Sequence, residues 1–211
     1  MHTILVANPK GGSGKTTLAT NIAGWLAGKR QRVVLADHDA QRSSTEWLAR
    51  RPALFPPIIG LAPEGTKKDV KGFDPQWMVV DTPAALHGED LGDALRRADL
   101  MLVPVSPSAF DIGATARFLA TVAERKAVRR GTLPLGLVAM RFDARTTSAG
   151  ELDAFLKSVA YPVVAHLRDT QVYVHCARDG ASVFDLPRAR GQQDWEQWKP
   201  LTRWIARHVS A

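Results

Sequence analysis

The sequence predicts an α/β fold, in which a doubly wound, mostly parallel sheet carries helices on both faces. Short apolar runs recur along the chain, and each is followed by a longer segment with helical spacing. Runs that are apolar on both sides are typical of buried parallel strands, and their alternation with helices is typical of a doubly wound sheet. With 211 residues, 45% of them hydrophobic, the chain is expected to form a single domain over residues 1–211.

Six apolar runs are predicted as strands, at residues 4–7, 33–36, 77–80, 100–105, 135–140 and 163–167. The intervening segments predict helices at 16–28, 43–50, 86–97, 112–129 and 148–159. Prolines and glycines interrupt residues 52–76, which predicts a loop with one short strand at 58–61. Apolar residues at helical spacing predict a closing amphipathic helix at 194–209 whose tryptophans pack on the core, although they could instead form a base-stacking surface.

The chain is basic, with a formal net charge of +7 and a sequence pI of about 9.9. This balance favours a polyanionic partner such as nucleic acid or anionic lipid, or simply a soluble basic surface. The single cysteine, Cys176, excludes an internal disulfide and is expected to be a small buried residue and not a catalytic thiol. Neither a secretion leader nor a run long enough to span a membrane is visible, so we expect a cytoplasmic protein.

Residues 8–17 read Asn-Pro-Lys-Gly-Gly-Ser-Gly-Lys-Thr-Thr and connect the first strand to the first helix. Glycines there allow successive backbone N–H groups to point at phosphate oxygens, and the helix N-terminus adds its dipole. Lys15 would reach the β- and γ-phosphates, and the Thr16 hydroxyl would bind magnesium. The predicted nucleotide-binding residues of this loop are Gly11, Gly12, Ser13, Gly14, Lys15, Thr16 and Thr17.

Carboxylates follow two of the other predicted strands. Asp37 and Asp39 leave the second strand two residues apart, so they project to the same side. Asp81 ends the run at 77–80, at the strand edge where open α/β sheets bind ligands. These carboxylates could hold magnesium through its water shell and order an attacking water, although an Asx-turn with solvated carboxylates is the alternative for the first pair.

These motifs together resemble the ParA/MinD family of P-loop ATPases. Residues 10–17 are similar to the family's deviant Walker A motif, residues 37–43 to its D-x-D-P-Q-x-S switch with Ala40 in place of proline, and residues 81–83 to Walker B. The segment 104–111 resembles the family pattern P-V-x-P-S-x-x-D. The resemblance implies three catalytic residues: Lys15, Lys10 reaching the nucleotide of a second subunit, and Asp39 positioning water. It makes Asp37 a structural or metal-shell companion, so the implied metal-binding residues are Thr16, Asp37, Asp39 and Asp81.

Residues 171–174 and 179–185 are similar to the late part of the short ParA partition ATPases, such as ParF, which lack an N-terminal helix-turn-helix. The first strand begins so early here that we expect no such domain and no operator-binding autorepression. The sequence departs from the family at Thr170, where an arginine is expected although Arg168 is close by, and at Met140-Arg141, where an asparagine is often found. These positions are expected near the base pocket, so Arg141 is included among the nucleotide-binding residues, and a preference for adenine is implied by the resemblance alone.

The resemblance implies an ATPase that binds ATP and Mg²⁺, dimerises on ATP and associates with nucleoid DNA without sequence preference. A cargo-linked partner protein would stimulate hydrolysis, so that turnover segregates or positions the cargo. One alternative is a MinD-like membrane regulator, whose membrane helix the end of the chain could mimic, with Arg203, Arg207 and His208 beside Trp204 and Ile205. Another is a P-loop metabolic ligase or kinase, for which the sequence shows no acceptor pocket.

Basic residues concentrate between positions 117 and 145. If 112–129 is one helix, Arg125 and Arg129 lie one turn apart on the same face, flanked by Lys126 and Arg130. Phosphate contacts by such a patch need no base recognition, so these four residues form the predicted DNA surface. The alternatives are a solvated helix face and, for DNA, the arginines near the C-terminus.

Overall fold

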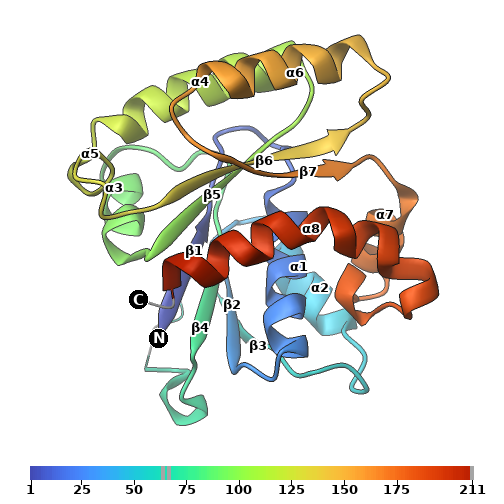
Figure 1. Cartoon of the computed structure of the whole chain (residues 1–211). Helices are drawn as coiled ribbons and strands as arrows, with labels where there is room; N and C mark the ends of the chain where they lie inside the picture. The colour runs from blue at the N-terminus through green and yellow to red at the C-terminus, as the bar shows by residue number, and fades with distance from the viewer. Residues whose placement is uncertain (63–64, 66–67, 210–211) are drawn as a thin grey trace.

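A computed structural model describes residues 1–62, 65 and 68–209 of the chain. Its centre is a seven-stranded sheet in the order β3-β2-β4-β1-β5-β6-β7, and every pair of neighbouring strands is parallel (Figure 1). The strands are β1 (His2–Val6), β2 (Val33–Asp37), β3 (Ile59–Leu61), β4 (Trp77–Asp81), β5 (Leu100–Val105), β6 (Leu135–Phe142) and β7 (Val163–Arg168). The predicted fold class and all seven predicted strands, including the short one, are confirmed.

Helices cover both faces of the sheet (Figure 1). One face is covered by α1 (Lys15–Gly28), α2 (Ser43–Arg50), α7 (Gln171–Arg178) and α8 (Arg188–Val209). The other is covered by α3 (Gly88–Arg97), α4 (Ala109–Ala123), α5 (Lys126–Arg129) and α6 (Thr147–Ser158). Short 3₁₀ turns occur at Lys71–Phe73 and Val183–Asp185. We refer to the two sides as the α1/α8 face and the α3/α6 face.

Alternate residues of each buried strand supply the two cores. In β1, Ile4 and Val6 lie in the core of the α1/α8 face, whereas Leu5 lies in that of the α3/α6 face, and all three are almost completely buried. All six tryptophans of the chain pack in or against the α1/α8 core. Trp198 of α8 is fully buried, which confirms that the closing helix packs on the core.

The continuous helix predicted at 112–129 is interrupted near its end. α4 ends at Ala123, and Arg125 has an extended backbone with ψ of 137° before the single turn of α5 begins. After the break, Ala127 and Val128 pack against the α3/α6 core. Tertiary packing therefore outweighs the local preference for a continuous helix.

Two other differences from the prediction occur near the end of the chain. Helix α7 was not predicted; it begins after Thr170, whose hydroxyl accepts a hydrogen bond from the Val172 N–H, as an N-cap residue does. Helix α8 begins six residues earlier than predicted and continues through Pro200. Pro63 and residues 64, 66 and 67, which belong to the predicted loop, lie outside the described residues, as do residues 210 and 211.

The strand order brings the ends of three functional strands together. β4 lies between β2 and β1, with Asp81 in register with Asp37 on one side and with Val6 on the other. Because the strands are parallel, their carboxyl ends meet at one edge of the sheet, where the chain also enters α1. The sheet topology therefore places the loop at 8–17 beside both carboxylate motifs.

Candidate functional site

The loop between β1 and α1 is curled by its glycines and anchored from behind. Gly12 and Gly14 have φ angles of 75° and 96°, in the left-handed region that glycine adopts without a steric penalty. The buried Asn8 amide donates to the Pro104 carbonyl at 2.8 Å and to the Thr115 hydroxyl at 2.9 Å. These bonds attach the start of the loop to β5 and α4, so its backbone is held in shape without a ligand.

The two lysines of the loop have different environments. Lys15 is buried, and its Nζ donates to the Lys10 carbonyl at 2.9 Å. Burial lowers the pKa of Lys15, while the nearby carboxylates of Asp81 and Asp39 act in the opposite direction. The Lys10 side chain is half-buried, and its ammonium forms no hydrogen bond or ion pair within the described part of the chain. Lys15 therefore faces into the loop, and Lys10 is free to contact another molecule.

Asp81 is the buried acid of the site. Its Oδ2 accepts hydrogen bonds from the Thr16 hydroxyl at 2.8 Å and the Ser44 hydroxyl at 2.7 Å. Its Oδ1 is buried and, among the described residues, has no hydrogen-bond partner. Burial raises the pKa of Asp81 to about 6, and the two hydroxyl donors partly oppose that rise. A buried carboxylate oxygen without a partner is the kind of group that a cation would satisfy.

Asp37 and Asp39 are placed differently from each other, although both follow β2. The Asp37 carboxylate is buried and accepts hydrogen bonds from the Thr45 N–H at 2.8 Å and the Thr45 hydroxyl at 2.9 Å, so it holds the first turn of α2. Asp39 is half-buried, and its Oδ1 accepts from the Gln41 N–H at 3.0 Å. Asp39 thus remains accessible at the mouth of the site, close enough to influence the pKa of Lys15.

The site fits magnesium together with a nucleotide. Thr16 and Asp81 are in direct contact, so both oxygens are placed to serve one magnesium site. No group of three or more His, Cys, Asp or Glu residues that could hold a metal occurs among residues 1–62, 65 and 68–209. Magnesium does not need such a group, because it is usually bound by one or two protein oxygens, by substrate phosphates and by water.

Arg141 lies against the phosphate loop from the end of β6. Its Nη2 donates to the Gly12 carbonyl and, at 3.1 Å, to the Ser106 hydroxyl, while its backbone has a φ of 49°. The preceding Met140 is so close to Gly14 that a Cβ there would come within 2.8 Å of the Met140 Cε. Arg141 therefore adjoins the loop that would hold the phosphates.

Arg168, considered above as a substitute for the arginine expected at position 170, forms an ion pair with another part of the chain. It forms a two-pronged ion pair with the buried Asp194 of α8, at 2.8 Å and 3.1 Å, and so attaches α8 to the end of β7. Arg168 therefore has a structural role, and Thr170 is the N-cap residue of α7.

Sequence reasoning missed Asn8, Ser106 and Ser44 as residues of the site. The switch resemblance indicates Ser43, but the structure shows that the next residue, Ser44, contacts Asp81. The hydroxyl bonds from Ser44 and Thr16 converge from two different helices, and no signal in the sequence specified that convergence.

The residues of the predicted DNA surface are not near the phosphate loop. Arg125 is half-buried, and its Nη2 donates to the Gly88 carbonyl of α3 at 3.1 Å. Lys126 and Arg129 are exposed on α5, and so is Arg130, which follows it. They therefore lie across from α3 and not on the face of one long helix. No helix in the described residues is long and apolar enough to cross a membrane.

The fold and this site define a nucleotide-binding protein, and comparison identifies its family. A family model described as the CobQ/CobB/MinD/ParA nucleotide binding domain matches residues 4–183, so the chain belongs to this family. The chain is 29% identical over 196 residues to the maintenance of carboxysome distribution protein A of Halothiobacillus neapolitanus, covering 90% of this chain and 89% of that protein. It is 33% identical over 192 residues to the protein of the same name from Gloeobacter kilaueensis, covering 85% and 82%.

A solved structure shares the fold over nearly its whole length. It is that of a plasmid partition protein of Borrelia burgdorferi bound to AMPPNP, which superposes with a TM-score of 0.72 at 18% identity and covers 96% of this chain and 98% of that chain. The α/β fold of the ParA/MinD ATPases, predicted from the motifs, is therefore confirmed.

Proposed function

We propose that this protein is a ParA-type ATPase that binds ATP with Mg²⁺, dimerises on ATP and uses hydrolysis to position a cargo. The proposal rests on one observation above all: Lys15 is turned into the phosphate loop, while the ammonium of Lys10 in the same loop is left without a partner in the described chain. A second lysine held at the loop but not used by it suits a phosphate that is bound by another subunit. The carboxysome-distribution and plasmid-partition names of its relatives support a positioning role.

The residues of the loop would bind the nucleotide by replacing hydrogen bonds within the loop with hydrogen bonds to phosphate oxygens. The Lys15 ammonium would leave the Lys10 carbonyl and donate to β- and γ-phosphate oxygens, as the lysine of a P-loop does. Backbone N–H groups of Gly12, Gly14 and Lys15 would hold the phosphates at the start of α1. The Thr16 hydroxyl and Asp81 would hold magnesium, which would supply positive charge to neutralise the phosphates.

Hydrolysis needs an oriented water and neutralisation of the charge that develops on the phosphate. Asp39 would orient the water, because its carboxylate stands half-exposed at the mouth of the site. Lys10 from a second subunit would neutralise the developing charge, so the dimer and not the monomer would be the active form. Asp37 would have a structural role and hold α2 and Asp39 in place, because its oxygens already accept hydrogen bonds from Thr45 and from the Asp39 N–H.

DNA and a partner protein complete the proposed cycle. The ATP-bound dimer would associate with nucleoid DNA through exposed cations, with Arg125, Lys126, Arg129 and Arg130 as the candidate residues. Dimerisation doubles the phosphate contacts and so raises the affinity through effective concentration. A cargo-linked protein would then stimulate hydrolysis and release the dimer.

The experiment compares three variants with the parent protein, using static light scattering with ATP and Mg²⁺, and phosphate release. Lys10→Gln is expected to bind a fluorescent ATP analogue normally but to remain monomeric. Asp39→Ala is expected to bind ATP and accumulate as a dimer, with turnover at least about 100-fold lower, the scale of losing an essential catalytic group. Lys15→Ala, the control, is expected to lose nucleotide binding.

Three outcomes would reject parts of this proposal. A Lys10→Gln protein that dimerises on ATP as strongly as the parent would remove the cross-subunit role of that lysine. Fast ATP consumption that depends on a small phosphoryl acceptor and not on DNA would point to a metabolic enzyme. Sedimentation with anionic liposomes only when ATP is present would point to a membrane regulator.

A further inference from the structure

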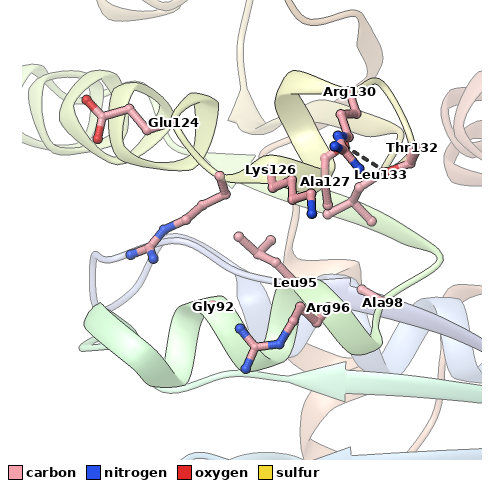
Figure 2. A pocket seen from close by; sticks show the side chains of 11 residues that line it. Gly92, Leu95, Arg96, Ala98, Glu124, Lys126, Ala127, Arg130, Thr132 and Leu133 are labelled. Atoms are coloured by element: carbon pink, nitrogen blue, oxygen red, sulfur yellow. Dashed lines mark hydrogen bonds between the residues drawn. The ribbon is translucent and has the colours of Figure 1, made fainter.

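A cleft of about 690 Å³ lies between α3 and α5, outside the nucleotide site (Figure 2). Its floor is aliphatic and includes Leu95, Ala98 and Leu133. Its rim carries four cations: Arg96 from α3, Arg125 from the connection between α4 and α5, Lys126 from α5, and Arg130, which follows α5. The volume is in the range of sites that hold small ligands or parts of larger ones.

Two of these arginines converge above Gly92. A Cβ on Gly92 would lie 3.3 Å from the Nη1 of Arg96 and 3.6 Å from the Nη1 of Arg125. Guanidinium groups from separate elements are therefore brought close together over a residue that has no side chain. Arg125 is held there by its bond to the Gly88 carbonyl, and Arg96 by an ion pair with Asp93.

The cleft has more positive than negative charge. Glu124 is the acid among the lining residues, and Asp93 of α3, next to Gly92 in the chain, is paired with Arg96. Within the described part of the chain, Lys126 and Arg130 form no ion pair. Like charges held at this spacing repel one another, and an anion between them would relieve that repulsion. Guanidinium groups also match phosphate geometry with two parallel hydrogen bonds.

The cleft lies away from the phosphate loop along the sheet. Ala98 and Leu133 lie two residues before the starts of β5 and β6, so the cleft opens where these strands begin, whereas the loop follows the end of β1. A parallel strand of six residues, such as β5, spans about 20 Å. A ligand in the cleft therefore would not compete with the nucleotide.

We infer that the α3/α5 cleft is a second phosphate-binding site, separate from the nucleotide site, and that Arg96 and Arg125 form its centre. Phosphate groups of this kind are present both in a DNA backbone and in small polyphosphates. The rim continues from Arg96 to Arg130 as a row of cations, which suits the repeated phosphates of DNA. The choice of DNA as the source of the phosphates rests on the proposed function. The row joins α3 to α5, so Arg96 extends the surface predicted from the sequence.

The test uses the full-length protein with saturating ATP and Mg²⁺ and a fluorescent DNA duplex of about 20 base pairs, measured by anisotropy over a salt series. Arg96→Gln with Arg125→Gln is expected to weaken binding at least about tenfold and to reduce the slope of log affinity against log salt by about 2. The matched control, Arg203→Gln with Arg207→Gln, removes the same charge from exposed positions of α8 and is expected to change affinity less than about threefold.

A second variant guards against a folding defect from loss of the Arg125–Gly88 bond. Lys126→Glu with Arg130→Glu alters exposed side chains without ion pairs in the described chain and is expected to weaken duplex binding as well. A second duplex of unrelated sequence should behave like the first, because backbone phosphates carry no sequence information.

Calorimetry with inorganic pyrophosphate, in the presence of saturating ADP to occupy the phosphate loop, distinguishes the source of the phosphate. If pyrophosphate binding is lost in the cleft variants while duplex binding is unchanged, the inference stands with a small ligand. If the cleft variants bind both probes as the parent does, or if only the α8 control loses duplex binding, the inference is overturned. Light scattering with ATP on the same samples reports dimerisation independently, so a failure of the proposed function is distinguished from a failure of the cleft.

Discussion

Charged residues are used differently on the two faces of the sheet. On the α1/α8 face, Arg51 and Asp185 form a two-pronged ion pair at 2.9 Å and 3.1 Å, and their side chains are only 5% and 4% exposed. Arg51 also donates to the Gly180 and Pro56 carbonyls. On the α3/α6 face, the ion pairs such as Arg96–Asp93 and Arg145–Asp143 are on the surface.

The difference separates charges that hold the fold from charges that are available to ligands. On the α1/α8 face, the pair Arg51–Asp185 joins the end of α2 to the turn at Val183–Asp185, and the pair Arg168–Asp194 joins β7 to α8. The arginines of the α3/α6 face lie beside an aliphatic core that does not need them. A substitution in the ion pairs Arg51–Asp185 or Arg168–Asp194 should therefore affect stability, and one among the cations of the α3/α5 cleft should affect binding.

The largest expected effect is on the α1/α8 face. Arg51→Met should lower the free energy of unfolding by about 3–5 kcal/mol, because it leaves Asp185 buried without its counter-charge. Urea unfolding followed by circular dichroism measures the loss. Arg51→Met combined with Asp185→Asn should be less destabilised than the single variant, since the uncompensated charge is gone. A loss below about 1 kcal/mol in the single variant would show that the pair is not structural.

A smaller effect on the free energy of unfolding, of opposite sign, is expected from a substitution of Asp81, at the end of β4. The pKa of Asp81 in the folded protein is about 6, above its ordinary value of 3.8. The folded state therefore holds the proton more tightly, so this group's contribution to stability falls as the pH rises from about 4 to about 6 and is then constant. Asp81→Asn should stabilise the nucleotide-free protein by about 2–3 kcal/mol at pH 8 but by little at pH 4.

Urea unfolding of the Asp81→Asn and parent proteins at both pH values tests this expectation. Asn keeps an oxygen that accepts from Thr16 and Ser44, so the hydroxyl bonds are preserved. The same difference at pH 4 and pH 8 would mean that the charge of Asp81 is not the cause. The variant should also lose Mg²⁺-dependent nucleotide binding under the proposed function.

The smallest effect on stability is expected on the α3/α6 face. Arg96→Gln should change the free energy of unfolding by less than about 0.5 kcal/mol, because its ion pair with Asp93 is exposed and solvent screens it. Thermal unfolding at low and high salt provides the measurement. If Arg96→Gln lowered the free energy of unfolding as much as Arg51→Met, the proposed difference between the charges of the two faces would be wrong.

The sequence predicted the order of elements and the phosphate loop, because strand periodicity and the loop motif are local signals. It also predicted that Thr16 and Asp81 lie close together at one magnesium site, since the carboxyl ends of parallel strands share an edge of the sheet. It could not predict the pair Arg51–Asp185, whose members are 134 residues apart in the chain. Nor did it predict the break before α5, because Glu124 and Arg125 carry no helix-breaking signal, and the packing of Ala127 and Val128 on the α3/α6 core involves residues distant in the chain.

The placement of the tryptophans has a consequence for optical measurements. All six lie in or against the α1/α8 core, and two of them, Trp47 and Trp198, are almost completely buried. Intrinsic tryptophan emission therefore reports on one side of this molecule, and melting confined to α3, α4, α5 and α6 would leave the signal nearly unchanged. Far-ultraviolet circular dichroism detects helices on both sides, so a mismatch between the two melting curves would reveal that the layers separate before the whole chain unfolds.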